Sequence, residues 1–157
     1  MCPDGTSSLD DFAEGKNVIV DCSDGSEDVR SGGTRAWRNS NMGNIRDGTF
    51  TDNHGSIGEA GGFAVFPSES TGYRALLSLL RTNKYQHLSI DAAVAQYAPR
   101  KENNTAAYQA FVRKATGLNG GTRLESLYGY QLVKVAQAIR SVEGWKEGTV
   151  TNRVPSQ

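Results

Sequence analysis

The sequence changes character near Pro67, and this change limits the folds open to the chain. Residues 37–68 are dense in glycine and hold only short apolar stretches, which is typical of short strands joined by tight turns. Residues 71–143 instead carry apolar side chains at helical spacing, and no internal repeat is present. We therefore predict a mainly α domain with a small β-hairpin element, which is an α+β fold.

Local signals set the ends of the predicted helices. Ser89 can cap the start of one helix, and Pro99 prevents its continuation. Gly117 and Gly144 follow the last apolar positions of two later helices, where glycine commonly ends a helix. A capping-box pattern at residues 122–125 predicts a further short turn. The predicted helices cover residues 71–82, 89–97, 104–117 and 130–143.

The charges divide the chain into an acidic arm and a basic body. Residues 1–30 contain eight Asp or Glu residues against two Lys or Arg residues, whereas residues 31–157 contain nine against fifteen. In the arm, a β-branched run at 17–20 and a turn signal at 23–26 predict a loose hairpin. We predict an arm at residues 1–36, a main domain at 37–148 and a tail at 149–157.

Length and composition narrow the class of protein. A chain of 157 residues supports one domain, and no apolar stretch is long enough to cross a membrane. The N-terminus has neither the basic nor the apolar region of a secretory signal. The basic body suits an anionic polymer such as peptidoglycan or nucleic acid, although a mixed, solvated surface explains the charges equally well.

The cysteines and histidines do not form a metal-site pattern, so no metal or cofactor is predicted. Free thiols are the default for Cys2 and Cys22, and a bridge between them is the alternative. Cys22 with His54 or His87 would resemble the nucleophile of a cysteine amidase. However, the acidic surroundings of Cys22 would raise the pKa of its thiol and oppose that role.

Glu143 is the candidate general acid, because it ends the last predicted helix directly before Gly144 and Trp145. The negative end of a helix disfavours a charged carboxylate, and shielding by Trp145 would do the same. Both effects would raise the pKa of Glu143 and keep its proton near neutral pH, as a general acid needs. A surface glutamate that merely precedes a helix end is the plainer alternative.

A polar and aromatic cluster follows the second helix, at Tyr97, Glu102, Asn103 and Tyr108. Tyrosine rings stack on sugar faces and amides bind hydroxyl groups, so this cluster is a candidate for glycan binding. The alternative is that the same residues cap a helix and fill the core. Glu59, in the glycine-rich segment, is a candidate second carboxylate, with a solvated loop glutamate as its alternative. No phosphate-binding loop and no nucleophile elbow is present.

The segments at residues 38–44, 62–66, 97–105 and 143–145 together resemble a family of phage-type peptidoglycan-degrading domains, of muramidase or lytic-transglycosylase type. This family occurs in phage virion lysins and in toxin domains of type VI secretion effectors. Two positions depart from the family pattern, since Ser40 and Met42 replace an Asn and a Pro.

The resemblance implies a lysozyme-like fold and cleavage of the β-1,4 bond between N-acetylmuramic acid and N-acetylglucosamine, as a hydrolase or a lytic transglycosylase. Glu143 would be the general acid, with Glu59 as the second carboxylate. The alternatives are a non-catalytic peptidoglycan-binding or virion structural module and a cysteine peptidoglycan amidase. The residues implied in substrate binding are Asn41, Asn44, Tyr97, Glu102, Asn103, Tyr108 and Trp145.

The order of the motifs is unusual, because many relatives have the helix-end glutamate before the Asn-rich motif, and here it comes last. We therefore predict a circularly permuted lysozyme-like domain, in which the last helix sets Glu143 against a hairpin at residues 39–66. This hypothesis requires Glu143 to lie close to Asn41 and Asn44.

The resemblance also implies a place of action and partners. The protein is expected to be a monomer that degrades peptidoglycan in the periplasm or cell wall and so acts as an antibacterial toxin or phage lysin. Without a signal peptide, a secretion machine, a phage particle or lysis would deliver it. An immunity protein or a delivery component would be its protein partner, and neither nucleic acid nor a membrane span is expected.

Overall fold

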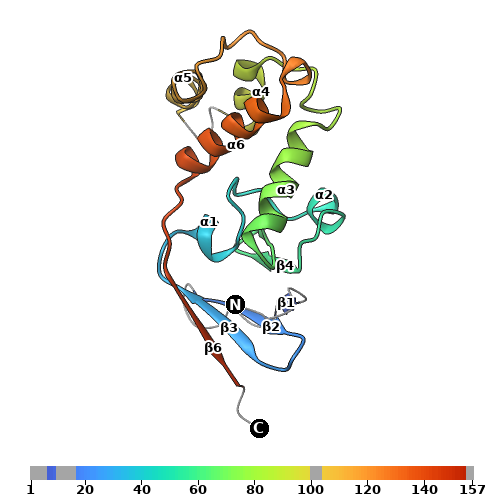
Figure 1. Cartoon of the computed structure of the whole chain (residues 1–157), viewed down its shortest axis with the longest axis vertical. Coiled ribbons are helices and arrows are strands. Elements are labelled where there is room, and N and C mark those ends of the chain that lie inside the picture. The colour runs from blue at the N-terminus through green and yellow to red at the C-terminus, as the bar shows by residue number, and fades with distance from the viewer. Residues whose placement is uncertain (1–6, 10–16, 100–103, 155–157) are drawn as a thin grey trace. The chain divides into compact units, whose positions relative to one another are not determined.

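The computed structural model describes residues 7–9, 17–99 and 104–154, and it has a mixed α+β architecture (Figure 1). The predicted α+β class is thereby confirmed. The strands are β1 (Ser7–Leu9), β2 (Val18–Cys22), β3 (Glu27–Ser31), β4 (Gly58–Ala60), β5 (Phe63–Val65) and β6 (Thr149–Arg153). The helices are α1 (Arg35–Arg38), α2 (Thr49–Asp52), α3 (Glu69–Leu80), α4 (Ile90–Tyr97), α5 (Thr105–Thr116), the 3-10 turn η1 (Leu124–Ser126) and α6 (Gly129–Glu143).

The chain divides into two compact units. The first unit consists of Met1–Ala75 together with Glu143–Gln157, and the second unit consists of Leu76–Val142. These compact units are defined by contacts and are not domains in the sense of our prediction. The predicted boundaries at residues 36 and 148 therefore stay a prediction. No helix in the described part of the chain is both long and apolar enough to cross a membrane.

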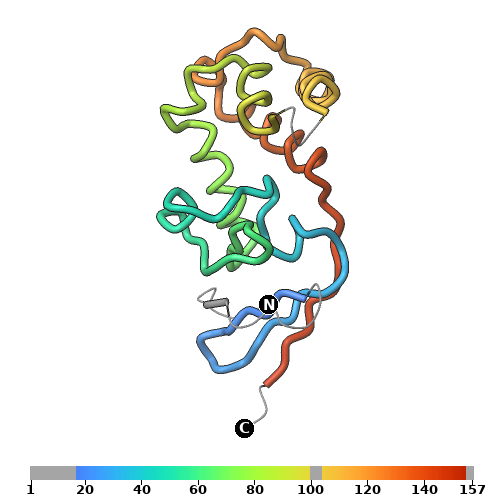
Figure 2. The backbone as a smooth tube through the Cα atoms, turned by 180° about the vertical axis from the view of Figure 1, so that it is seen from behind, coloured from blue at the N-terminus to red at the C-terminus, as the bar shows by residue number. Residues whose placement is uncertain are grey.

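The larger sheet of the first unit joins strands from the early and the late part of the chain. Its strand order is β1-β2-β3-β6, and each neighbouring pair is antiparallel. The hairpin predicted in the arm is present as β2 and β3. The β content is larger than the two hairpins that we predicted, because β6 pairs with β3 from Glu27↔Arg153 to Ser31↔Thr149. Figures 1 and 2 both show the red C-terminal strand beside the blue β3.

A buried arginine ties this sheet to the next part of the first unit. Arg30, on β3, is 5% exposed. Its Nη1 donates to the carbonyl oxygens of Arg38 at 3.0 Å and Phe66 at 3.1 Å, and its Nη2 donates to Pro67 O at 2.7 Å. Burial lowers the pKa of Arg30 to about 10, against the opposing effect of Asp28, so the side chain remains charged at neutral pH.

The smaller sheet of the first unit is a tight hairpin. A two-residue loop connects β4 to β5, and Gly61 and Gly62 adopt φ angles of 64° and 87°, as a type I′ turn requires. The chain before α2 adds to this sheet, because Ala64 N donates to Ile45 O at 3.0 Å and Asp47 N donates to Gly62 O at 3.1 Å. Short strands, which the glycine-dense composition of residues 37–68 predicts, are therefore present here, and residues 45–47 run along β5.

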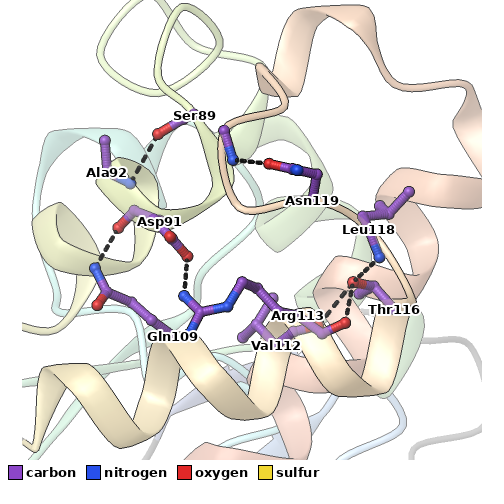
Figure 3. A network of polar contacts seen from close by, with 10 residues as sticks. Ser89, Asp91, Ala92, Gln109, Val112, Arg113, Thr116, Leu118 and Asn119 are labelled. Carbon is purple, nitrogen blue, oxygen red and sulfur yellow. Dashed lines mark hydrogen bonds and ion pairs between the residues drawn. The ribbon is translucent and has the colours of Figure 1, made fainter.

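An ionic and polar network joins helices of the second unit (Figure 3). Asp91, in the first turn of α4, accepts a hydrogen bond at 2.7 Å from Arg113 of α5. Gln109 of α5 donates to the main-chain oxygen of Asp91 at 2.8 Å. The loop after α5 closes on the same residue, since Asp91 N donates to Gly120 O at 3.0 Å. Ser89 caps α4 as predicted, accepting from Ala92 N at 3.1 Å.

Candidate active site

Glu143 lies at the end of α6, is half-buried, and contacts the Asn-rich segment. Asn44 Nδ2 donates to Glu143 Oε1 at 3.2 Å and to the main-chain oxygen of Glu143 at 3.4 Å. The two residues are 99 positions apart in sequence, and both belong to the first unit. Gly144 has a φ of 91°, the left-handed conformation that commonly ends a helix. The contact between Glu143 and Asn44 that the permutation hypothesis requires is therefore present.

The loop of Asn44 is held in place by Asn41. The amide nitrogen of Asn41 donates to Ile45 O at 2.8 Å and to Ala64 O at 2.9 Å, and its oxygen accepts from Ile45 N at 2.9 Å. Asn41 is 0% exposed, so its amide has no atom to offer a sugar. The side chain thus braces the loop against β5, and its expected contact with substrate stays a prediction that this burial opposes.

Asn44 itself carries two local costs. Its φ is 47°, which is uncommon for a residue other than glycine. Its side-chain oxygen is buried and has no hydrogen-bond partner among the described residues. Buried oxygens without partners are rare, and such costs gather at functional sites. The conformation of Asn44 thus marks the loop as a candidate site independently of the contact with Glu143.

The chain that follows Glu143 is held by Thr34. Thr34 N donates to Lys146 O at 3.0 Å, and Lys146 N donates to Thr34 Oγ1 at 3.1 Å. These bonds continue the pairing of β3 with β6 toward the end of α6. Sequence reasoning did not single out Thr34, since its contact depends on the position of a segment 112 residues away.

Glu59 lies in the first unit on β4, where its Oε2 accepts a hydrogen bond at 2.8 Å from Gly62 N. The carboxylate therefore braces its own hairpin turn and is only half-buried. Its role as second carboxylate stays a prediction. Trp145 is half-buried directly after Gly144, and its shielding of Glu143 stays a prediction.

The tyrosines of the predicted sugar-binding cluster lie in the core of the second unit. Tyr108 is 4% exposed, and the ring centroid of Tyr97 is 6.3 Å from that of Tyr85. Tyr97 and Tyr108 line a cavity of about 10 Å³, which is too small for a sugar. Tyr108 is therefore packed as the core alternative expects, Tyr97 is half-buried beside it, and contact of either ring with glycan stays a prediction. Glu102 and Asn103 lie outside the described residues.

Cys22 is disulfide-bonded, so the default of free thiols was wrong for this residue. Cys2, the other cysteine of the chain, lies outside the described residues. A disulfide sulfur is not a thiolate, so Cys22 in this state cannot act as the nucleophile of an amidase. Among the described residues, no group of three or more His, Cys, Asp and Glu side chains is arranged to hold a metal ion.

No model of a known protein family matches the chain, and no curated protein matches it by sequence. The case for a function therefore rests on Glu143 and the residues that hold it.

Proposed function

We propose that this protein cleaves the glycan strand of peptidoglycan, with Glu143 as the general acid of a circularly permuted lysozyme-like domain. The observation that carries the proposal is the hydrogen bond of 3.2 Å between Asn44 Nδ2 and Glu143 Oε1. It joins a helix-end carboxylate to an Asn-rich loop beside a hairpin, which is the arrangement that the permuted order of the motifs requires. Glu143 as a residue is half-buried, which is compatible with a general acid that is partly shielded from water.

Asn44 would set which oxygen of Glu143 carries the proton. Its amide group faces two acceptors, Glu143 Oε1 and the main-chain oxygen of Glu143, so the nitrogen must be the atom on that side. An oxygen that accepts from Asn44 is the carbonyl-like oxygen of a protonated carboxyl group. The proton then resides on Oε2, from which it passes to the glycosidic oxygen as the bond from that oxygen to the anomeric carbon breaks.

The second half of the reaction has two forms, which differ in their products. In hydrolysis, a water oxygen bonds to the oxocarbenium-like carbon and its proton returns to a carboxylate, with Glu59 as the candidate for that base. In transglycosylation, the hydroxyl group of the muramic acid itself forms the new bond, and Glu143 takes up its proton. The first form yields a reducing end and the second an anhydro sugar.

Digestion of purified peptidoglycan tests the proposal. Wild type, Glu143→Gln and the control Glu147→Gln would be compared, with muropeptides identified by mass spectrometry. Glu147 is exposed and four positions further along the chain, so the control makes the same chemical change outside the contact. We expect glycan fragments from wild type and from the control, and a loss of about a thousandfold or more in the Glu143→Gln rate. Full activity of Glu143→Gln would refute the assignment.

A non-catalytic peptidoglycan-binding or virion structural module is the second candidate. It is favoured by the bond from Asn44 to the main-chain oxygen of Glu143, because that bond closes the end of α6 whether or not chemistry occurs. Binding of peptidoglycan without any product from wild type would support this candidate. Action at the cell wall, delivery by a phage or secretion machine, and an immunity partner remain part of the proposal.

A further inference from the structure

Two arginines contact one phenylalanine ring in the first unit. The guanidinium carbon of Arg35 lies 4.5 Å from the centroid of the Phe63 ring, and that of Arg46 lies 5.0 Å from it. Arg35 begins α1, whereas Arg46 is the bridge partner of Phe63 on the neighbouring chain segment. Both arginines are exposed and Phe63 is half-buried. Cation–π contacts with the ring thus hold two positive charges at one place on the surface.

Arg38 adds a third positive charge to this neighbourhood. Its Nη1 donates to the carbonyl oxygens of Gly32 and Gly33, each at 3.0 Å. The pKa of Arg38 is lowered, first by burial and second by the positive charge of Arg35. The positive charges of Arg35 and Arg38 therefore repel each other, and a bound anion would offset this repulsion.

The loop that contains Arg46 also contains Asn44, which contacts Glu143. Arg46 is two residues beyond Asn44, and the amide of Asn41 fixes the backbone between them through both polar atoms of Ile45. A ligand bound by Arg46 would therefore have a fixed position relative to Asn44, because Asn41 holds the backbone between these two residues.

We propose that Arg35 and Arg46, oriented by Phe63, bind the carboxylate groups of the peptide stems attached to the glycan strand. The inference rests on the proposed function, because it names the part of that substrate which this cluster recognises. Guanidinium groups match carboxylates in shape and charge, and contact with a ring orients them. Nucleic acid fits less well, since its binding generally uses many phosphate contacts along a basic surface, whereas this cluster is small.

The test measures binding to insoluble peptidoglycan by sedimentation, with every protein carrying Glu143→Gln so that the polymer stays intact. The test variant is Arg35→Gln/Arg46→Gln. The matched control, Arg74→Gln/Arg81→Gln, removes the same charge at two other exposed arginines. Each is measured on native peptidoglycan and on peptidoglycan whose peptide carboxylates have been amidated.

We expect the test variant to bind native peptidoglycan about tenfold more weakly than the control. Amidation should weaken the control by the same factor and leave the test variant unchanged. Arg35→Lys/Arg46→Lys keeps the charge and should recover part of the affinity. The amidation arm needs no change at the cluster, so it remains informative if the test variant folds poorly.

Equal affinity of test variant and control for native peptidoglycan would overturn the inference, as would the absence of any effect of amidation on the control. Binding of single-stranded DNA is compared in the same two variants. A larger loss of affinity of the test variant for DNA than for peptidoglycan would also overturn the inference. Failure of the proposed function would be seen separately. In that case wild type yields no glycan fragments, whatever the binding assay shows.

Discussion

Thr34 and Lys146 are joined by hydrogen bonds in both directions, although they lie 112 residues apart. Thr34 N donates to Lys146 O at 3.0 Å, and Thr34 Oγ1 accepts from Lys146 N at 3.1 Å. Lys146 is three residues beyond Glu143, and β6 begins three residues beyond Lys146. The position of the candidate acid thus depends on a sheet that pairs β3, early in the chain, with β6, late in the chain.

Gly33→Ala should weaken this connection. A Cβ atom at Gly33 would overlap the carbonyl oxygen of Lys146 and lie 2.7 Å from Gly148 N, and the φ of Gly33 is 62°. Gly25→Ala is the control, because Gly25 has a φ of 87° but no atom within 4 Å of the added carbon. In urea unfolding we expect about 1 kcal/mol of loss for Gly25→Ala and roughly 2–3 kcal/mol for Gly33→Ala. Equal losses would mean that the close approach to Lys146 does not matter.

Gly120→Ala tests the network of the second unit. The added Cβ would overlap the carboxylate of Asp91 and displace it from Arg113, so we expect a loss of about 1–2 kcal/mol in urea unfolding. Gly129→Ala, where nothing lies within 4 Å, should not destabilise the protein. Gly120→Ala and Arg113→Met both act on the bond between Asp91 and Arg113. Gly120→Ala should therefore lower the free energy of unfolding by less in an Arg113→Met background than in wild type. Full additivity would show that the clash leaves the Asp91–Arg113 bond intact.

The longer helices could be predicted because their signals are local. Apolar spacing predicted 71–82 and 130–143, and the structure has α3 at Glu69–Leu80 and α6 at Gly129–Glu143. The short helices α1 and α2, of four residues each, were missed, because a single turn has no periodicity to detect.

The sheet could not be predicted in full, because β3 and β6 pair across more than a hundred residues. The sequence predicts a tail at residues 149–157, because Thr149–Arg153 contains a single apolar residue and so has no strand-like alternation. Arg30 was missed for a related reason. Its three acceptors come from Arg38, Phe66 and Pro67, and nothing near Arg30 in the sequence indicates a buried cation.

The candidate site was predicted in part. The pairing of Asn44 with Glu143 follows from the motifs, whereas the bracing role of Asn41 does not, because an asparagine that binds sugar and one that binds backbone look alike in sequence. Tyr108 shows the same ambiguity, since an aromatic residue at helical spacing can face a groove or the core. The structure places it in the core.

Arg30→Met should be strongly destabilising, because three carbonyl oxygens lose their donors. We expect about 2–4 kcal/mol of loss in urea unfolding. Arg153→Met is the comparison, since its bond of 3.1 Å to Glu27 is a partly exposed ion pair worth at most about 1 kcal/mol. Similar losses in both variants would contradict the tie formed by Arg30.

The pKa of Arg30 also sets a pH expectation. The pKa of Arg30 is lower in the folded state, at about 10, than in the unfolded state. Burying the charged side chain therefore costs folding free energy, and this cost declines only as the pH rises above about 10. Between roughly pH 6 and pH 9 the cost is constant. The difference in unfolding free energy between wild type and Arg30→Met should therefore not vary with pH in that range, and a clear slope would show that another titrating group is coupled to Arg30.

Asn44→Gly separates the hydrogen bond to Glu143 from the backbone conformation. Glycine adopts the φ of 47° without strain, so the loop should keep its course while the amide donor is lost. On peptidoglycan we expect kcat to fall about tenfold with little change in KM, because the carboxyl group loses orientation rather than substrate contact. Ser40→Gly relieves a similar φ of 50° and should leave kcat unchanged. A higher KM at unchanged kcat would instead make Asn44 a residue that binds substrate, and equal effects of both variants would trace the loss to the backbone.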